Sequence, residues 1–517
     1  MRIQLASRCS SGSVVNRLFS RSAVRWAICC LYLVSLFAFF TRASIAQEQS
    51  ITGFPPFATI AGNVDAINAV NLNAHLEIPV VHRAGVKLPF NYNLSYDSTI
   101  YYPSGGAWTP VPNWGWRGVT EGFLGYITVE QTTFSDGSLE DSTLVYHDSR
   151  GTTHSFGTVV VCQLSSHCPT SSSGFSTDGA GYFVSLTGNE DYITISLYDI
   201  AGDGLGAPAF INGAVPQNAT GAIDDPNGNE LAALVNGGTI TFEDTLTDQV
   251  DQRNTVMTVS GTNPVNYQYT GPNSTAETVA VNYGTYNIQT HFGCSSVKEY
   301  SASNVSLISS IGMPDGTSYS FTYELNGSYY TGRVAKIGLP TGSTISYQYT
   351  GGSSGIDCAD GTAAGLKRTT PDGSWTYTRS NTTGVTYAGQ GITTTILDPS
   401  SNKTVYTFSD GYQTQRQVSS SSGTPLDTLV TCYNGNYASC ASTSTAISGA
   451  IKQQDGYHTP GGVNAQTSLS ETFYNAVGLT TQDNEFGYGI NTGAAPTGTP
   501  IKAILSSYSP TLGTAIK

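Results

Sequence analysis

One pentapeptide in the sequence contains a residue type that could act as a nucleophile. Gly351-Gly352-Ser353-Ser354-Gly355 fits the pattern Gly-x-Ser-x-Gly. In a hydrolase this motif needs a strand before the serine and a helix after it. Here a Tyr-rich strand precedes the motif, but Ile356-Asp357-Cys358 and a second glycine loop follow it. We therefore expect a hairpin loop rather than a nucleophile elbow.

Two further groups of side chains could bind a metal ion. Asp225, Asn227 and Asn229 have the spacing of the first three oxygen ligands of a calcium loop. Glu230 replaces the glycine that such a loop needs, and no Glu stands at the twelfth position, so an Asx-type turn with at most weak Ca²⁺ binding is favoured. His147 and His154 have no third ligand at a clear spacing. We predict no metal site and no cofactor.

Three tryptophans, Trp108, Trp114 and Trp116, lie in a Pro/Gly-rich segment and allow two interpretations. If exposed, they could stack on sugar rings or anchor a protein partner, as in a carbohydrate-binding adhesin. If buried, they cap the open end of a β core, as large aromatic residues usually do. The paired carboxylates Glu140-Asp141 and Asp224-Asp225 both lie in turn-like contexts. We predict no catalytic residue, and a secreted hydrolase is the third and least favoured function.

A turn followed by an alternating strand recurs along the chain and must position all of these residues. The three clearest copies are Pro314-Asp315-Gly316-Thr317 before Tyr319, Phe321 and Tyr323, Pro340-Thr341-Gly342-Ser343 before Ile345, Tyr347 and Tyr349, and Pro371-Asp372-Gly373-Ser374 before Trp375 and Tyr377. Glycine permits the positive φ of a tight turn, and apolar residues at every second position indicate a strand. The pattern predicts an array of β-hairpins, which typically supplies a surface or a container.

The composition of the 517 residues favours the same fold class. Only 11% of the residues are charged, whereas there are 57 Gly and 31 Tyr, a balance that favours strands and turns over helices. The aromatic content of 11% argues against disorder. No window has a long amphipathic helical pattern with caps. We predict an all-β fold with little helix.

Changes in composition suggest four segments. We expect a signal peptide at 1–46, an irregular N-terminal β region at 47–260, regular β-hairpin repeats at 261–441, and a weaker or partly irregular tail at 442–517. The boundary near residue 260 has an alternative interpretation, namely a loop inside one continuous β assembly.

The N-terminal segment has the features of a secretory leader. Five arginines precede an apolar run from Ala27 to Phe40, and the small residues Ser44-Ile45-Ala46 precede Gln47. An uncleaved N-terminal anchor is the alternative. Without residues 1–46, 16 basic residues face 36 acidic ones, and the net charge changes from −14 to −20. A chain this acidic is a poor partner for nucleic acid and, after removal of the leader, for a membrane surface.

Six cysteines remain after the leader, an even number that agrees with export into an oxidising compartment. Six cysteines allow 15 connectivities. Local pairing favours Cys162 with Cys168 and Cys432 with Cys440, which leaves Cys294 for Cys358.

Several phrases resemble the YD repeats of bacterial RHS (rearrangement hotspot) proteins. Tyr474–Thr480 is similar to their Tyr-Asp-x-x-Gly phrase with Asn475 in place of Asp, and Tyr198–Gly202 matches its first half. Asp225–Asn229 and Leu339–Tyr347 resemble the family's turn-then-strand phrase. Asn71–Ser98 looks like the N-terminal region of secreted RHS proteins, so the resemblance covers most of residues 65–490.

The resemblance implies a spiralling β-hairpin sheet, which in many RHS proteins closes into a shell around a C-terminal toxin. No counterpart of the family's C-terminal core segment or of a toxin precedes Lys517, so we expect the front part of a toxin-shell protein. We predict an exported, non-enzymatic scaffold that contacts a cell-surface glycan or protein. A partial array exposes a terminal strand, so self-pairing through that edge is also expected.

Overall fold

The structure is a computed structural model that describes residues 59–508, except 62–63, 85–87, 134–138, 151, 157–159, 163–170, 177–179, 189–192, 212–219, 246–253, 382–390, 442–446, 448–450, 463 and 477. The chain divides into Met1–Ile45 and Ala46–Lys517, and all described residues belong to the second unit. The expected leader and Cys168 lie outside the described residues. Within the described residues, no helix has the length and apolar character needed to cross a membrane.

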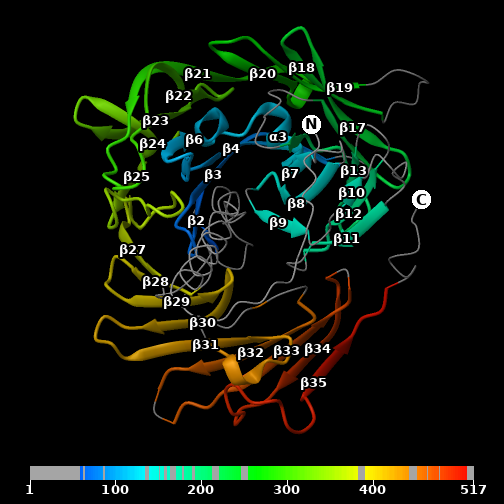
Figure 1. Ribbon diagram of the computed structural model, residues 1–517, viewed down its shortest axis with the longest axis vertical. Coiled ribbons are helices and arrows are strands. Elements are labelled where there is room, and N and C mark those ends of the chain that lie inside the picture. Colours follow the sequence, from blue (N-terminus) through cyan, green and yellow to red (C-terminus); the bar gives the residue numbers. More distant parts are fainter. Residues whose placement is uncertain are drawn as a thin grey trace, which may run out of the picture. The chain divides into compact units, whose positions relative to one another are not determined.

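The prediction of an all-β fold with little helix is confirmed (Figure 1). The described residues contain one α-helix, α3 (Val119–Leu124). They also contain three short 3₁₀ turns, which are η2 (Pro112–Gly115), η4 (Pro272–Ser274) and η5 (Tyr437–Ser439). Every other element is a strand.

A 24-stranded sheet runs from residue 171 to residue 505, and each strand pairs antiparallel with the next one in the sheet. Its first half consists of β11 (Ser171–Phe175), β12 (Phe183–Gly188), β13 (Ile193–Tyr198), β14 (Gly204–Leu205), β16 (Gly221–Asp224), β17 (Glu230–Asn236), β18 (Thr239–Asp244), β19 (Asn254–Ser260), β20 (Val265–Thr270), β21 (Ala276–Gln289), β22 (Ser301–Gly312) and β23 (Ser318–Asn326). Its second half consists of β24 (Tyr329–Gly338), β25 (Thr344–Thr350), β26 (Gly365–Thr370), β27 (Gly373–Asn381), β28 (Ile392–Leu397), β29 (Lys403–Ser409), β30 (Tyr412–Ser419), β31 (Pro425–Tyr433), β32 (Gln453–Pro460), β33 (Ser468–Tyr474), β34 (Thr480–Phe486) and β35 (Lys502–Leu505).

This sheet is continuous across both of the boundaries expected from the sequence. β19 pairs with β20 on either side of residue 260, and β31 pairs with β32 on either side of residue 441. Residues on both sides of each boundary therefore share one sheet, while the expected division into domains stays a prediction.

One hydrogen-bonded turn recurs between strands and explains the Tyr-Asp phrase. In each copy the side-chain oxygen of an Asp accepts hydrogen bonds from the backbone amides two and four residues later, and the copies are at Asp148, Asp199, Asp225 and Asp398. Asn475 accepts the amide of Leu479 in the same way, at 2.9 Å. An Asx side chain thus replaces a backbone acceptor in the turn.

The turn-then-strand phrases form hairpins with the predicted alternation. Gly316 and Gly342 have φ of 82° and 83°, as their tight turns require. The residues that alternate after them, Tyr319, Phe321 and Tyr323 on β23 and Ile345, Tyr347 and Tyr349 on β25, are all buried. The repeated tyrosines are therefore core residues.

Three smaller sheets precede or join the large one. The first has the order β1 (Thr59–Ala61), β2 (Asp65–Asn68), β3 (Ala74–Arg83) and β4 (Phe90–Asp97), and the second is a ribbon of β5 (Tyr101–Ser104) and β6 (Ala107–Pro110). The third contains β10 (Val160–Cys162), β8 (Leu139–His147), β7 (Tyr126–Thr133) and β15 (Ala209–Ile211), with β9 (Thr153–Phe156) paired to β8.

The strands β2–β6 and helix α3, here called the N-terminal module, pack against one face of the large sheet (Figure 1). One hydrophobic core contains residues of both parts. Tyr92 of β4, for example, lies 5.5 Å from Phe242 of β18 and 5.6 Å from Tyr267 of β20, between ring centroids. A second, smaller cluster joins Ala69 and Val70, which follow β2, to Ile392 of β28 and Phe408 of β29.

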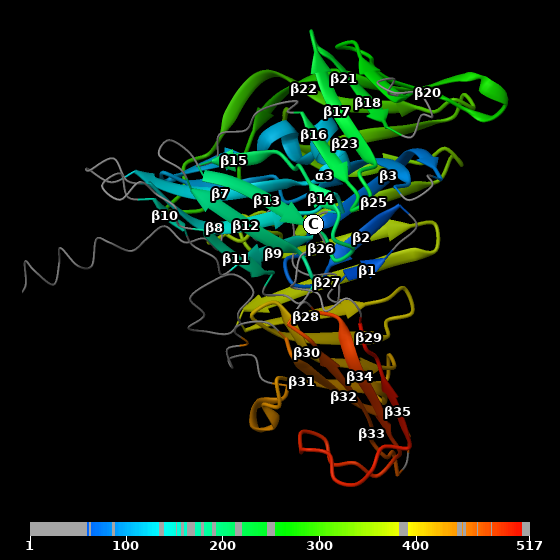
Figure 2. The ribbon, with the colours of Figure 1, turned by 90° about the vertical axis from the view of Figure 1, so that its right-hand side faces the viewer.

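The strands β31–β35, here called the C-terminal strip, have a separate small core. It consists of Val430, Cys432, Tyr457, Leu469 and Phe486. In both ribbon views these strands, drawn in orange to red, lie apart from the blue strands of the N-terminal module (Figures 1 and 2).

Candidate functional site

The three tryptophans lie where the N-terminal module meets β21–β24, so they do not form an exposed ligand surface. Trp108 and Trp116 are 2% and 6% exposed, and Trp114 is half-buried. The Trp108 ring packs edge-on against Phe292 at 5.4 Å, and the Trp116 ring packs edge-on against Phe321 at 5.1 Å. The rings of Trp108 and Trp116 are thus packed in the core, whereas the half-buried Trp114 packs edge-on against Tyr101 and Tyr300, and ligand contact at these residues stays a prediction.

Polar side chains join the module to the sheet over long sequence distances. The Tyr101 hydroxyl donates to the Thr331 carbonyl at 2.7 Å, and the Tyr96 hydroxyl accepts the Val334 amide at 3.0 Å. These two tyrosines are among the largest fully buried side chains of the described residues. The contacts fix β4 and β5 against β24.

A buried ion pair adds a third link between module and sheet. The Asp65 carboxylate accepts hydrogen bonds from the Arg368 guanidinium, at 2.7 Å from its terminal nitrogen, and from the Tyr347 hydroxyl, also at 2.7 Å. The Asp65 side chain is fully buried and the Arg368 side chain is 12% exposed. A two-pronged pair of this kind is charge-balanced and directional.

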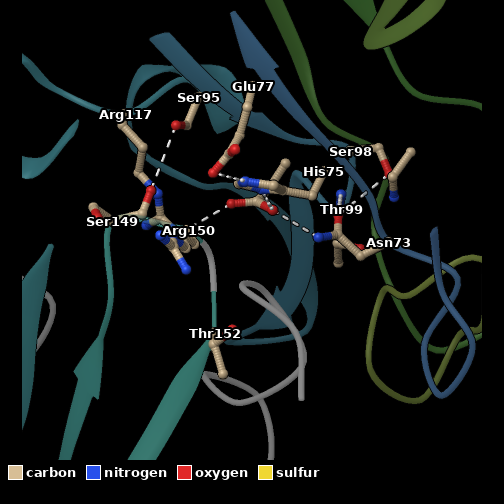
Figure 3. Close-up of polar contacts among 12 residues, drawn as sticks. Asn73, His75, Glu77, Ser95, Ser98, Thr99, Arg117, Ser149, Arg150 and Thr152 are labelled. Carbon is tan, nitrogen blue, oxygen red and sulfur yellow. Dashed lines mark hydrogen bonds and ion pairs between the residues drawn. The ribbon is translucent and has the colours of Figure 1, made fainter. Parts of the chain in front are cut away.

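Inside the module, a polar cluster surrounds Asp97 (Figure 3). Asn73 donates to Asp97 Oδ1 at 2.7 Å, His75 Nδ1 lies 3.0 Å from the same oxygen, and Arg117 donates to Oδ2 at 3.1 Å. Burial lowers the pKa of His75, but Asp97 and, more weakly, Glu77 outweigh it and raise the pKa to about 9. The raised pKa favours the cationic imidazole at neutral pH, so His75 and Arg117 both balance the charge of Asp97.

The Gly-x-Ser-x-Gly segment forms the expected loop between strands β25 and β26. No helix follows Ser353, whose amide donates to the Ile356 carbonyl at 3.0 Å. The loop covers a hollow of about 600 Å³ whose lining includes Ser353, Cys358 and Arg379. Arg379 donates to Asp357 at 2.9 Å, so its charge is already neutralised there. The lining of the hollow thus contains Ser353 and the Asp357–Arg379 pair.

The possible calcium ligands are used by the recurring turn. Partial burial raises the pKa of Asp225, but hydrogen bonds from Asn229 and Asn227 outweigh it and lower the pKa to about 2. The amide nitrogens of both Asn side chains point at this carboxylate, at 2.7 and 3.2 Å. The Asx turn is thus confirmed. Among the described residues, no group of three His, Cys, Asp or Glu could hold a metal ion.

The two histidines lie between aromatic rings in the β7–β9 region. His147 stacks on Tyr126 with ring centroids 4.3 Å apart, and its Nε2 lies 2.9 Å from the Thr128 hydroxyl. His154 packs against Tyr182, 4.4 Å between ring centroids. Both histidines are strand residues within the packed structure, as the sequence favoured.

Two of the three expected disulfides are present. Cys294 is bonded to Cys358 and Cys432 to Cys440. Cys162 ends β10, and its expected partner Cys168 is outside the described residues. Disulfides of this kind belong to proteins that fold in an oxidising compartment.

A carboxylate pair in the C-terminal strip is not apparent from the sequence. Asp455 of β32 and Glu471 of β33 stand directly opposite each other, and both accept hydrogen bonds from Gln453 Nε2. Burial, with a further contribution from Glu471, raises the pKa of Asp455 to about 6 against the lowering effect of Gln453. The two carboxylates are 16 positions apart in the sequence, so the pair could have been predicted only if the strand register were known.

Comparisons with known proteins identify no family and no similar curated protein for this chain. One similar solved structure is described as "Crystal Structure of TcdB2-TccC3-TEV", with 9% sequence identity and a TM-score of 0.14 over 82% of this chain. This chain spans 29% of that one. A likeness at that TM-score carries no weight for the fold or the function.

Proposed function

We propose that this chain is an exported, non-enzymatic β scaffold of the RHS/YD-repeat type that acts by contact with a glycan or protein at or outside the bacterial cell surface. The observation that carries the proposal is the sealing of the N-terminal module against the sheet. Asp65, Tyr96 and Tyr101, which could otherwise line a site, are used in joining the two parts. The recurring Asx turn supports the YD-repeat assignment.

The absence of an activity is part of the proposal. In the described part of the chain, Ser353 lies in a loop that no helix follows, and the raised pKa of His75 favours its cationic form. The burial of Trp108 and Trp116 supports a scaffold over an adhesin surface at residues 108–116. A scaffold that presents a surface requires neither a base nor a nucleophile.

Export is tested first, with the full chain carrying a C-terminal epitope in a bacterial host. We expect protease added to intact cells to remove the epitope, and the mature protein to begin near Gln47. A Leu33→Arg/Leu36→Arg variant, which interrupts the apolar run, should keep the epitope protected because a charged run does not enter the export machinery. An epitope that stays protected in the unchanged chain contradicts the proposal, whereas an accessible chain that keeps its leader selects the anchored alternative.

Enzyme status is tested on the purified mature chain with a panel of ester, peptide and glycoside substrates. We expect no turnover above that of heat-denatured protein. Turnover that disappears in Ser353→Ala, with Ser354→Ala as the matched control next to it, would contradict a non-enzymatic scaffold. Both serines lie in the same loop, so the pair separates chemistry from loop structure.

A further inference from the structure

The β5–β6 ribbon of the N-terminal module is held by two loops of the large sheet, one at each of its strands. The first loop follows β21 and meets β6. There Trp108 donates its amide to the Lys298 carbonyl at 3.0 Å, and Lys298 donates its amide to the Gly106 carbonyl at 2.9 Å. Phe292 of the same loop packs edge-on against Tyr101 at 5.5 Å.

The second loop connects β25 with β26 and meets β5. A Cβ atom at Gly361 would lie 2.0 Å from the Tyr101 carbonyl oxygen, so only glycine permits this approach. The loop is braced internally, because Asp357 donates its amide to the Thr362 carbonyl and Gly361 donates its amide to the Asp357 carbonyl, both at 2.8 Å. The ribbon therefore contacts a stiff turn on this side.

The Cys294–Cys358 disulfide joins the two loops to each other. Cys294 belongs to the first loop and Cys358 to the second, 64 residues later. The disulfide thus links covalently the two loops that contact the ribbon. The Cys432–Cys440 disulfide differs, because it links the end of β31 to a turn only 8 residues later and contacts no part of the module.

The two sulfurs differ in access. Cys294 is buried, at 6% exposed, whereas Cys358 is partly exposed and contributes to the lining of the 600 Å³ hollow under the second loop. A small thiol can therefore reach Cys358 through the hollow. Exchange proceeds by attack of a thiolate on one sulfur and depends on access to it.

We propose that the Cys294–Cys358 disulfide is a redox-controlled clasp that holds the N-terminal module on the sheet. In the opening step a thiolate of a small dithiol bonds to Cys358 Sγ, the S–S bond breaks, and Cys294 leaves as a thiolate that takes up a proton. The second thiol of the reductant then displaces Cys358. Altogether the protein disulfide gains two electrons and two protons, and the dithiol is oxidised to its cyclic disulfide. The freed loops release the ribbon. This inference does not depend on the proposed function.

Hydrogen exchange on the mature chain tests the clasp before and after treatment with dithiothreitol, with reduction verified by alkylation and mass. We expect exchange over residues 101–110 to become about tenfold faster on reduction, with little change over β31–β34. Cys294→Ala/Cys358→Ala should show the fast exchange without reductant, and the control Cys432→Ala/Cys440→Ala should behave like the unchanged chain. Unchanged exchange over 101–110 in the reduced chain, an equal rise over the whole sheet, or a disulfide that the folded chain does not allow dithiothreitol to reduce would each overturn the proposal.

Glutathione maps the direction of attack and does not require a variant to fold. Brief treatment at a sub-stoichiometric concentration, followed by acid quench and peptide mapping, should place the mixed disulfide on Cys358. A mixed disulfide placed mainly on Cys294 would overturn the assigned route through the hollow. The Cys432–Cys440 pair in the same sample serves as the internal reference.

Discussion

Two regions of the large sheet, its middle strands and its C-terminal strip, bury their inner face in different ways. Strands from β17 to β29 are covered by the N-terminal module, which shares a hydrophobic core with them. The C-terminal strip is covered by short segments of its own connections, such as those containing Tyr437, Cys440 and Ile490. The contacts between the module and the sheet join residues that can be hundreds of positions apart, whereas the contacts that cover the strip join residues that are close in the sequence.

The difference also appears in how charges are buried. Under the module, buried acids meet buried cations, as Asp65 meets Arg368 and Asp97 meets Arg117. In the strip, the buried Asp455 meets another carboxylate, Glu471, and is satisfied only by amides and a hydroxyl. Ionisation of these acids therefore stabilises the folded state at the module, whereas ionisation of Asp455 destabilises the folded state of the strip.

The largest expected effect comes from breaking an ion pair in each region. Asp65→Asn leaves the nearly buried Arg368 without its counter-charge, and we expect a loss of about 3–5 kcal/mol in the free energy of unfolding. The matched change Asp427→Asn in β31 removes the partner of Arg416, whose side chain is 38% exposed, and should cost about 0–1 kcal/mol. Urea denaturation followed by circular dichroism measures both. Equal losses would remove the distinction between the two regions.

The second prediction concerns alkaline pH and the module. The folded-state pKa of His75, about 9, lies above its ordinary value of 6.5, so its contribution to stability is complete below pH 6.5 and is lost as pH rises through 9. We expect the free energy of unfolding of the unchanged chain to fall by about 1–3 kcal/mol over this pH range because of His75, and we expect His75→Gln not to show this fall. Unfolding measured from pH 6 to pH 10 gives the difference, and parallel curves for the two proteins would show that His75 is not charged in the folded chain.

Sequence patterns predict the parts of this structure that depend on near neighbours. The alternation after Gly316 and Gly342 identifies strands and their buried face, since a turn and a period of two residues are local properties. The burial of the Trp108 ring depends on its contact with Phe292, and the pairing of the Asp65 carboxylate depends on Arg368, 303 residues away. No pattern within a window of the sequence contains such a pairing. Of the contacts between distant segments, the sequence favoured only Cys294–Cys358, and only because the other cysteines had nearer partners.

The third prediction concerns mildly acidic pH and the strip. The folded-state pKa of Asp455, about 6, lies above its ordinary value of 3.8, so ionisation destabilises the strip above pH 6, and the penalty disappears as pH falls toward 3.8. Amides of β32–β34 should exchange more slowly at pH 5 than at pH 7.5 after correction for intrinsic rates, by a factor of about 3–10. Asp455→Asn should remove this dependence, and Asp483→Asn, on β34, should retain it. A pH effect that survives Asp455→Asn would assign the titration to another group.

The smallest effect on stability, and the sharpest test of the free end, is expected at β35. Among the described residues β35 is the last strand of the sheet and pairs only with β34, and Leu505 on it and Ile501 just before it are 78% and 77% exposed. At the opposite end β11 is not equivalent, because a bridge between Phe156 and Ser176 brings β9 beside it. An unprotected apolar edge favours pairing with another strand, and two β35 edges are complementary to each other.

Ile504→Lys/Leu505→Lys should therefore lower self-association while changing the free energy of unfolding by about 0.5 kcal/mol or less, since both side chains are exposed. Leu426→Lys is the matched control, because Leu426 is also exposed but lies at the start of β31, inside the sheet. Sedimentation velocity over a range of concentrations measures the association. If the edge variant and the control associate equally, the free end of the strip does not mediate contact between copies, and the module side of the sheet becomes the surface to test next.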